Sequence, residues 1–191
     1  SGLMLWNIFS SGVTNASNSL VANANIIKKI YFPRLIMPFS AILVSLFDFI
    51  MAFIIYIGII IFYGFPLNWN IIFFLPLSLI VTTFSSFGIG TLLAALNVKY
   101  RDFRYVIPFM IQILFFLTPI IYPASMIKFK WAQYILALNP ISTAIDLLRH
   151  TITGSPLNHQ IIISGILISI ALFLFGIFYF RKTESYFADL A

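Results

Sequence analysis

The chain has 191 residues, of which 61% are hydrophobic and only 8% are charged, with a net charge of +6 and a mean hydropathy of +1.04. Soluble domains carry about 25% charged residues, so this composition excludes a water-soluble fold. The few basic residues form no stripe that would bind nucleic acid, and the absence of cysteine excludes disulfides, thiolate metal sites and cysteine nucleophiles. The chain is therefore predicted to be an all-α membrane protein, a polytopic helical bundle with a single transmembrane domain over residues 1–191.

A helix that crosses a membrane needs about 20 mostly apolar residues, and five segments of the chain qualify. They are residues 3–21, 37–63, 69–96, 103–121 and 161–180. The first is the weakest candidate, because Asn, Ser and Thr recur in it at helical spacing. This pattern indicates a polar face turned into a bundle or a pore, and a partly interfacial helix is the alternative. The fourth contains Pro108 and Pro119, whose missing backbone donors neighbouring helices must compensate.

The segment between the last two spans, residues 122–159, is apolar in patches but too broken to cross a membrane. Asn139-Pro140 is typical of a helix start, with Asn as the N-cap and Pro in the first turn. Gly154 suits the C-terminal cap. We therefore predict a short helix over residues 140–153, with Ile141, Ile145 and Leu148 on one face, and a second short helix at residues 131–138. Both are expected to be re-entrant or interfacial.

The basic residues indicate the orientation, because cytoplasmic loops are enriched in Lys and Arg. With five spans, the loops on one side contain eight such residues and those on the other side three (Lys128, Lys130 and Arg149). The eight are Lys28, Lys29, Arg34, Lys99, Arg101, Arg104, Arg181 and Lys182. The C-terminus is therefore predicted to be cytoplasmic. Five spans that end inside must begin outside, so we expect a sixth span before Ser1 in the natural protein.

Four short motifs occur along the chain in a fixed order. They are residues 23–36 (NANIIKKIYFPRLI) followed by Asp48-Phe49, residues 96–102 (LNVKYRD), residues 118–123 (TPIIYP) and residues 138–140 (LNP). In this order and with these gaps, the chain resembles the membrane (permease) subunit of type-2 ABC exporters. The most similar branch exports lipid-linked O-antigen, capsular polysaccharide or teichoic acid.

The resemblance implies a homodimer that works with two copies of a separate nucleotide-binding ATPase subunit in the bacterial inner membrane. The pore would form between the two permease copies and admit an extended lipid-linked glycan. ATP and Mg²⁺ would be bound on the partner subunit, and this chain would hold no cofactor. Membrane lipids would surround the assembly.

The first cytoplasmic loop is short, basic and apolar, as an amphipathic helix that docks into a groove of a partner would be. The resemblance implies that it couples the permease to the ATPase, through Ile26, Ile27, Lys28, Lys29, Tyr31, Pro33 and Arg34. The alternative is a loop whose cations only set the topology. A second group is expected at the cytoplasmic mouth, where Asp102 can pair with an arginine: Asn97, Arg101, Asp102 and Arg104.

Asp48 is predicted to lie near the middle of its span, where a charged residue usually faces protein or water. It is interpreted as a residue of the substrate pathway, as a proton-coupling carboxylate, or as a structural carboxyl bonded to Ser or Thr of a neighbouring helix. The outer segment is expected to form a gate or a static cap. Its candidate residues are Pro119, Tyr122, Pro123, Asn139, Pro140 and Arg149.

Catalysis by this chain is not expected. Only one of its five acidic residues, Asp146, lies on the outer side, which argues against paired-carboxylate glycoside chemistry. His150 and His159 have no third ligand close in sequence, so we predict no metal site, and no phosphate-binding loop motif occurs. The alternative functions are an ion-coupled secondary transporter that uses Asp48 and, less favoured, a membrane-embedded enzyme.

Overall fold

The computed structural model describes residues 2–29, 32–64, 69–100, 102–121, 136, 138–154 and 157–184, apart from the side chains of residues 28, 29 and 153. All regular structure in this part of the chain is helical, which confirms the predicted all-α class. The helices are α1 (Gly2–Ala22), α2 (Ala24–Lys29), α3 (Ile36–Phe62), α4 (Ile71–Lys99), α5 (Phe103–Leu117), α7 (Pro140–Thr153) and α8 (His159–Thr183).

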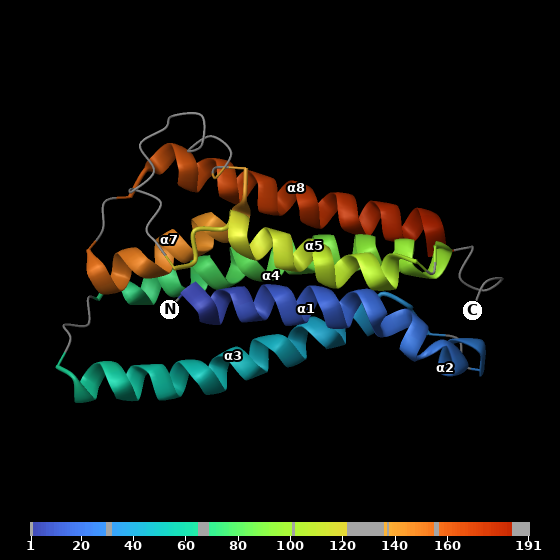
Figure 1. The fold of residues 1–191 in the computed structure, drawn as a ribbon, viewed down its shortest axis with the longest axis horizontal. Helices are drawn as coiled ribbons and strands as arrows, with labels where there is room; N and C mark the ends of the chain where they lie inside the picture. Colours follow the sequence, from blue (N-terminus) through green and yellow to red (C-terminus); the bar gives the residue numbers. More distant parts are fainter. Residues whose placement is uncertain are drawn as a thin grey trace.

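The five longer helices α1, α3, α4, α5 and α8 run side by side along the long axis of the bundle (Figure 1). α4 packs against α1, α7 and α8, and α1 packs against both α4 and α3. α2 and the end of α8 lie at one end of the bundle, whereas the start of α1 and α7 lie at the other (Figure 1). Consecutive long helices therefore alternate in direction, as in a chain that crosses a membrane repeatedly.

Within the described residues, three helices are long and apolar enough to cross a membrane, namely α3, α4 and α8. α1 has 21 residues, but its Asn, Ser and Thr side chains lower its hydropathy. α5 has 15 residues, or about 22 Å of helix, against a hydrocarbon core of about 30 Å. That α1 and α5 also cross the membrane, which would make five crossings, stays a prediction.

α5 ends at Leu117 and not at residue 121, where the apolar run ends. Thr118, which follows it, has an extended backbone with φ −91° and ψ 131°. The ring of Pro119 disfavours helical geometry in the residue before it, so the chain leaves the helix at this point.

α4 is the helix around which the others pack, and its buried face carries small and hydroxyl-bearing residues. Five of these hydroxyls donate hydrogen bonds of 2.7 to 2.8 Å to backbone carbonyls of α4 itself. They belong to Ser78, Thr82, Ser85, Ser86 and Thr91, all of which are buried. Because each hydroxyl is satisfied within its own helix, neighbouring helices can approach α4 closely without leaving a polar group unpaired.

Glycines allow this close approach between α4 and α8. A Cβ atom added to Gly176 would overlap the backbone carbonyl of Gly88, and one added to Gly88 would overlap the backbone of Leu172. On the other side of α4, a Cβ atom at Gly90 would lie 2.9 Å from the Cβ of Ala16 in α1. α4 is therefore held against two helices at distances that only glycine permits.

α7 has the boundaries and caps that its sequence predicts. The side chain of Asn139 accepts a hydrogen bond from the backbone N–H of Ile141, and Gly154 adopts the left-handed conformation, with φ 65°. Ile141, Ile145 and Leu148 are buried and join the main core cluster with residues of α1 and α4. α7 is thus part of the packed bundle. The second predicted short helix, at residues 131–138, lies outside the described residues, except for Leu136 and Leu138.

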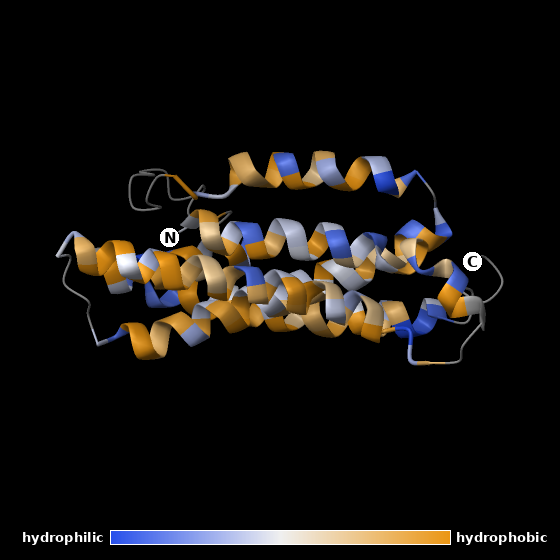
Figure 2. Ribbon diagram, turned by 90° about the horizontal axis from the view of Figure 1, so that it is seen from below, coloured by the Kyte–Doolittle hydropathy of each residue, from blue (hydrophilic) through white to orange (hydrophobic). Residues whose placement is uncertain are grey.

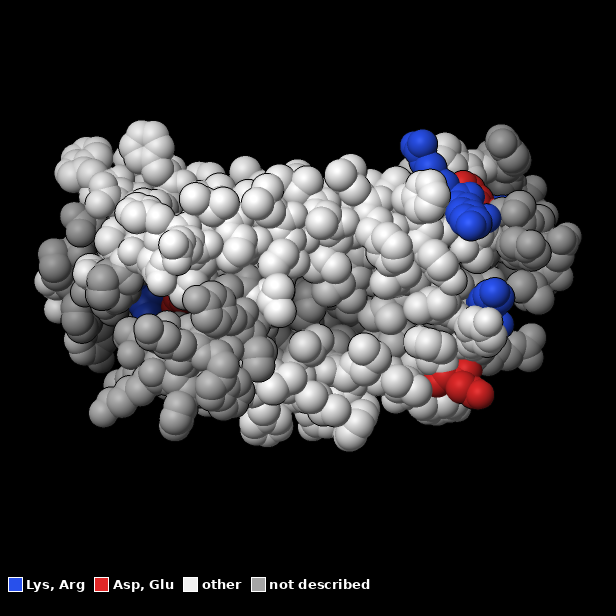
Figure 3. All heavy atoms as spheres, turned by 90° about the horizontal axis from the view of Figure 1, so that it is seen from above, with Lys and Arg blue, Asp and Glu red and all other residues white. Residues whose placement is uncertain are grey.

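Charge and hydropathy divide the bundle into zones along its length. Hydrophobic residues predominate on most helices, hydrophilic ones also run along the middle of the bundle, and several gather at the end where the C-terminus lies (Figure 2). On the face that Figure 3 shows, charged atoms gather at that same end, a small charged patch lies near the opposite end, and the band between them is uncharged. This distribution fits a bundle whose long axis crosses the membrane.

The glycine contact generates a stability prediction. Gly176→Ala forces α4 and α8 apart, and we expect it to lower the free energy of unfolding by about 1–3 kcal/mol. The matched control is Gly58→Ala in α3, where the added Cβ atom meets nothing within 4 Å. The control should be neutral or slightly stabilising, because Ala favours helix over Gly. Thermal unfolding in detergent measures both, and equal melting temperatures would contradict the close packing of α4 and α8.

Candidate functional site

α1 has two faces of different chemistry. The face that packs on α3 and α4 is mostly apolar, with Leu5, Ile8, Val13 and Ala16 fully buried. The opposite face is exposed or half-exposed and carries only polar residues from one turn to the next: Asn7, Ser10, Ser11, Thr14, Asn15 and Asn18. In a membrane segment such a face requires water or a polar partner. The sequence predicted a polar face, and the structure leaves it exposed or half-exposed, with Asn18 at its end in contact with Asn97 of α4.

Two asparagines of this face have free side-chain amides. Ser11, Thr14 and Asn18 donate hydrogen bonds to backbone carbonyls of α1 itself. Among the described residues, Asn7 and Asn15 make no side-chain hydrogen bond, and both are exposed. These two side-chain amides are therefore available to bind a partner outside the chain.

Asp48 lies on α3 beside the polar face of α1. A groove of about 360 Å³ between the two helices is lined by Asp48, Asn7, Ser45 and Trp6, among others. Ser11 donates a hydrogen bond of 3.1 Å to Ser45, which joins the two helices at this level. Asp48 itself is exposed and has no hydrogen bond or ion pair within the described residues. The expected structural bond from Asp48 to a neighbouring Ser or Thr is therefore not found there.

At the opposite end from α7, the first loop contains the six-residue helix α2. Ile27 packs against the cluster of Leu20, Ala94, Ala95 and Phe180, whereas Ile26 is 46% exposed. Arg34 donates a hydrogen bond to the backbone carbonyl of Glu184 at the end of α8. Pro33 is exposed beside it, Tyr31 lies outside the described residues, and only the backbone of Lys28 and Lys29 is described. The loop is thus attached to α8 and packs on α1 and α4.

Asn97 is a buried link between two helices. It is 2% exposed, and its amide donates hydrogen bonds to the Ser17 carbonyl at 3.0 Å and to the Asn18 side chain at 3.2 Å. Nearby, Asp102 and Arg104 are both exposed and form no ion pair with each other, and Arg101 lies outside the described residues. Of the four residues expected at the cytoplasmic mouth, Asn97 has the clearest structural contact.

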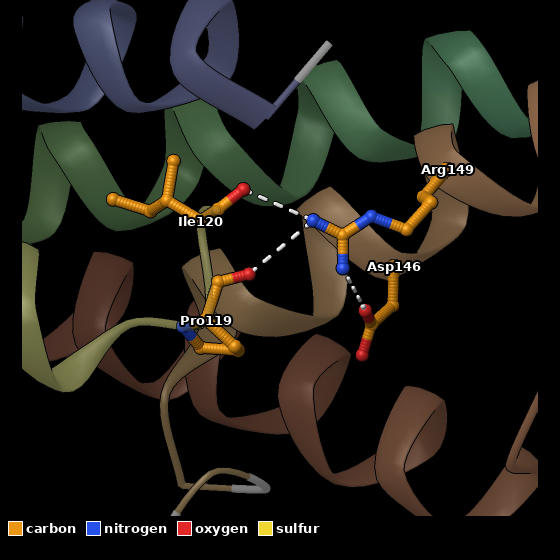
Figure 4. Close-up of polar contacts among 4 residues, drawn as sticks. All are labelled: Pro119, Ile120, Asp146 and Arg149. Carbon is orange, nitrogen blue, oxygen red and sulfur yellow. Dashed lines mark hydrogen bonds and ion pairs between the residues drawn. The ribbon is translucent and has the colours of Figure 1, made fainter. Parts of the chain in front are cut away.

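At the α7 end, Arg149 fastens α7 to the segment that follows α5 (Figure 4). Its guanidinium donates to the carbonyl of Ile120 at 3.0 Å and to that of Pro119 at 3.4 Å. A second guanidinium nitrogen lies 3.6 Å from a carboxylate oxygen of Asp146. Arg149 thus contacts two backbone carbonyls that lie beyond the end of α5, and one acidic side chain.

Asn139 makes a second contact between α7 and the same segment. Its amide donates to the Thr118 hydroxyl at 2.8 Å, while its oxygen caps α7 at 3.0 Å. α7 therefore contacts residues 118–120 through Asn139 at its start and Arg149 near its end. Of the six residues expected at the outer gate, Pro119, Asn139, Pro140 and Arg149 come together here, whereas Tyr122 and Pro123 lie outside the described residues.

The carboxyl of Asp146 has a raised pKa in this arrangement. Burial raises the pKa of its carboxyl from 3.8 to about 6, although the positive charge of Arg149 acts to lower it. The folded protein therefore holds this proton more tightly than the unfolded chain does. The stability that this group contributes is fully present below the unfolded pKa of 3.8 and is lost as the pH rises through the folded pKa of about 6.

Sequence reasoning missed these long-range contacts. It placed Asn97 at the cytoplasmic mouth and Arg149 near the end of its helix, without their partners. The Asn97–Ser17 contact joins residues 80 apart in sequence, and no local pattern predicts such a pairing. Within the described residues, no group of three or more His, Cys, Asp or Glu side chains could hold a metal ion.

The pKa of Asp146 generates a pH prediction. We expect Asp146 to raise the melting temperature of the purified chain as the pH falls from about 7 to about 4, and Asp146→Asn to remove that contribution. The difference between the two pH profiles is the relevant quantity. Asp102→Asn, which changes an exposed carboxylate, is the control and should keep the original slope. An unchanged slope in Asp146→Asn would contradict the burial of this carboxyl.

Comparison with known proteins identifies the family. The model of the family described as "ABC-2 type transporter" matches residues 1–153. The chain is also 30% identical over 191 residues to an O-antigen export system permease protein, RfbA, of Klebsiella pneumoniae, covering 99% of this chain and 73% of that protein. The protein of the same name from Myxococcus xanthus is 30% identical over 141 residues, covering 73% of this chain and 54% of that protein.

These matches agree with the resemblance of the four ordered motifs and with the apolar helical bundle. The family model covers α1 to α7, and the match to the Klebsiella protein covers 99% of the chain, α8 included. The chain belongs to the ABC-2 type transporter family, as a multi-pass membrane permease subunit.

Proposed function

We propose that this chain is the permease subunit of an ATP-driven exporter that moves a lipid-linked polysaccharide or polyol-phosphate polymer out across the bacterial inner membrane. The observation that carries the proposal is the polar face of α1, which runs along a helix in the midst of apolar ones. A glycan offers many hydroxyl groups to such a face. The names of the similar proteins, both O-antigen export permeases, support the choice of substrate class.

Two copies of the chain are needed to enclose a pore in this proposal. One copy provides a polar face of α1, with Asp48 of α3 beside it and exposed aromatic residues on α5, which also contacts α1. Tyr105, Phe109 and Phe116 of α5 are 80%, 63% and 77% exposed. Aromatic faces stack on the C–H groups of sugars, and asparagine side chains bind their hydroxyls. A second copy that faces the first would close this half-open wall.

ATP and Mg²⁺ are bound by a separate nucleotide-binding subunit, present in two copies, which docks at the first cytoplasmic loop. Ile26 offers an exposed apolar contact on α2, beside the basic residues Lys28 and Lys29. The bond from Arg34 to Glu184 and the packing of Ile27 connect α2 to α8, α1 and α4. A force on α2 would therefore reach the helix that carries the polar face.

The segment from Pro119 to α7 acts as the outer gate. Arg149 and Asn139 hold the Thr118–Ile120 backbone against α7, and a Cβ atom at Gly2 would lie 2.9 Å from the Ile120 carbonyl. The start of α1 therefore touches the same backbone, so a shift of α1 would disturb this clamp. No observation favours the ion-coupled alternative over this proposal.

The proposal predicts that ATP-dependent export requires both subunits. The purified chain alone should hydrolyse no ATP, and vesicles should transport polymer only when the nucleotide-binding subunit is also present. Lys28→Glu combined with Lys29→Glu should weaken subunit binding and export together, since both charges lie on α2. Lys182→Glu, at the end of α8, is the control. Transport by the chain without an ATPase would contradict the proposal.

The orientation makes a separate prediction, which the lack of native cysteine simplifies. Single cysteines at Lys99 and Lys182 should react with a membrane-impermeant thiol reagent only from the cytoplasmic side. A cysteine at Asn70, which makes no capping hydrogen bond at the start of α4, should react only from outside. Labelling of the Lys99 position in intact cells would show that the bundle is inverted.

A further inference from the structure

We propose that the groove between α1 and α3 is a saccharide-binding subsite, in which Asp48 and Asn7 bind hydroxyl groups of the passing polymer. The inference rests on the proposed export function and adds to it a named site. The site lies where the polar face of α1 comes beside the Asp48 carboxylate of α3.

The groove is built from both helices. Asn7 and Trp6 line it from α1, and Ser45, Asp48 and Ala52 line it from α3. The hydrogen bond from Ser11 to Ser45 fixes the two helices to each other beside it. Its volume of about 360 Å³ is near the lower end of the range for small-molecule pockets. It suits one or two sugar units of a longer chain.

The polar groups of the groove are free to bind a ligand. Asp48 and Asn7 are exposed, and neither makes a hydrogen bond or ion pair within the described residues. A carboxylate in a membrane-spanning helix faces water, a polar partner or protein, because contact with lipid is unfavourable. Asp48 and Asn7 both line the groove, whose other lining residues are mostly apolar.

The chemistry of the groove fits a sugar better than other ligands. A carboxylate accepts hydrogen bonds from two hydroxyls, and an amide both donates and accepts them. Trp6 and Phe49 also line the groove and add aromatic surface against which C–H groups of a sugar can pack. A bound cation would need more oxygen ligands than one carboxylate and one amide provide. A lipid tail would leave the carboxylate without a partner.

A subsite of this kind should bind weakly. A transport pathway needs sites that are favourable enough to enter and weak enough to leave. Two polar side chains in an open groove meet this requirement. The subsite would hold successive units of the polymer in turn as the chain moves along α1.

The test uses Ala52→Cys as a reporter, because Ala52 lines the groove without supplying a polar group. The full exporter, with its nucleotide-binding subunit, is expressed in cells that make the host's lipid-linked polysaccharide and in cells in which that synthesis is blocked. A small impermeant thiol reagent labels the reporter. We expect labelling in the blocked cells and protection by the polymer in the others. Ile55→Cys on the same helix, 66% exposed and outside the groove, should not react, because it faces lipid.

The role of the polar groups is tested in the same reporter. Asp48→Leu should reduce the protection by roughly tenfold, the effect of losing one charge-assisted hydrogen bond, and Asp48→Asn should reduce it less. Gln160→Leu, at an exposed polar position of α8 outside both the groove and the polar face of α1, is the control and should retain protection.

Three outcomes would overturn the inference: no labelling at Ala52→Cys, labelling that the polymer does not prevent, or protection that survives Asp48→Leu unchanged. Protection by sodium ions and not by the polymer would assign the groove to a cation and would also overturn it. Surface polysaccharide is measured in parallel on cells with the unmodified permease. Its absence would refute export itself, whereas normal export with any of the outcomes above refutes only the subsite.

Discussion

The structure depends on one constraint, which is that a helix with a continuous polar face cannot lie in lipid. α1 carries such a face, and its other side is almost entirely buried against α3 and α4. The apolar side fixes how the helix is rotated, so most of the polar side stays outside the contact with α4, apart from Asn18, which Asn97 binds. In a membrane that polar side is stable only if water, substrate or a second copy contacts it. Fold and proposed pathway therefore follow from the same amphipathic helix.

The packing of α4 holds this arrangement in place. Its buried hydroxyls bond within the helix, and its glycines let α8 and α1 approach on two sides. Asn97 adds a directional contact near the end of α1, which a purely apolar interface would lack. Since interhelical hydrogen bonds in membranes are individually worth only about 0.6 kcal/mol on average, Asn97 contributes more to the rotational register of α1 than to stability.

The caps and ends of helices were more predictable from the sequence than the contacts between helices. α7 could be predicted from local chemistry, because Asn139, Pro140 and Gly154 determine its caps regardless of the rest of the fold. The shortened α5 could have been anticipated from the position of Pro119. In contrast, the contact of Arg149 with the Ile120 carbonyl depends on how α5 and α7 meet in space. The groove beside Asp48 likewise required the pairing of α1 with α3, which no periodicity reveals.

The most direct test of the central claim is the pattern of water access along α1 in the assembled exporter. Single cysteines would replace Asn7, Ser11, Asn15 and Asn18 on the polar face, and Leu5, Val13 and Ala16 on the buried face. Leu167 of α8, 62% exposed, is the control for a lipid-facing position. The account predicts that an impermeant thiol reagent labels the first group and neither the second nor the control. Labelling of both faces alike, or of neither, would contradict it.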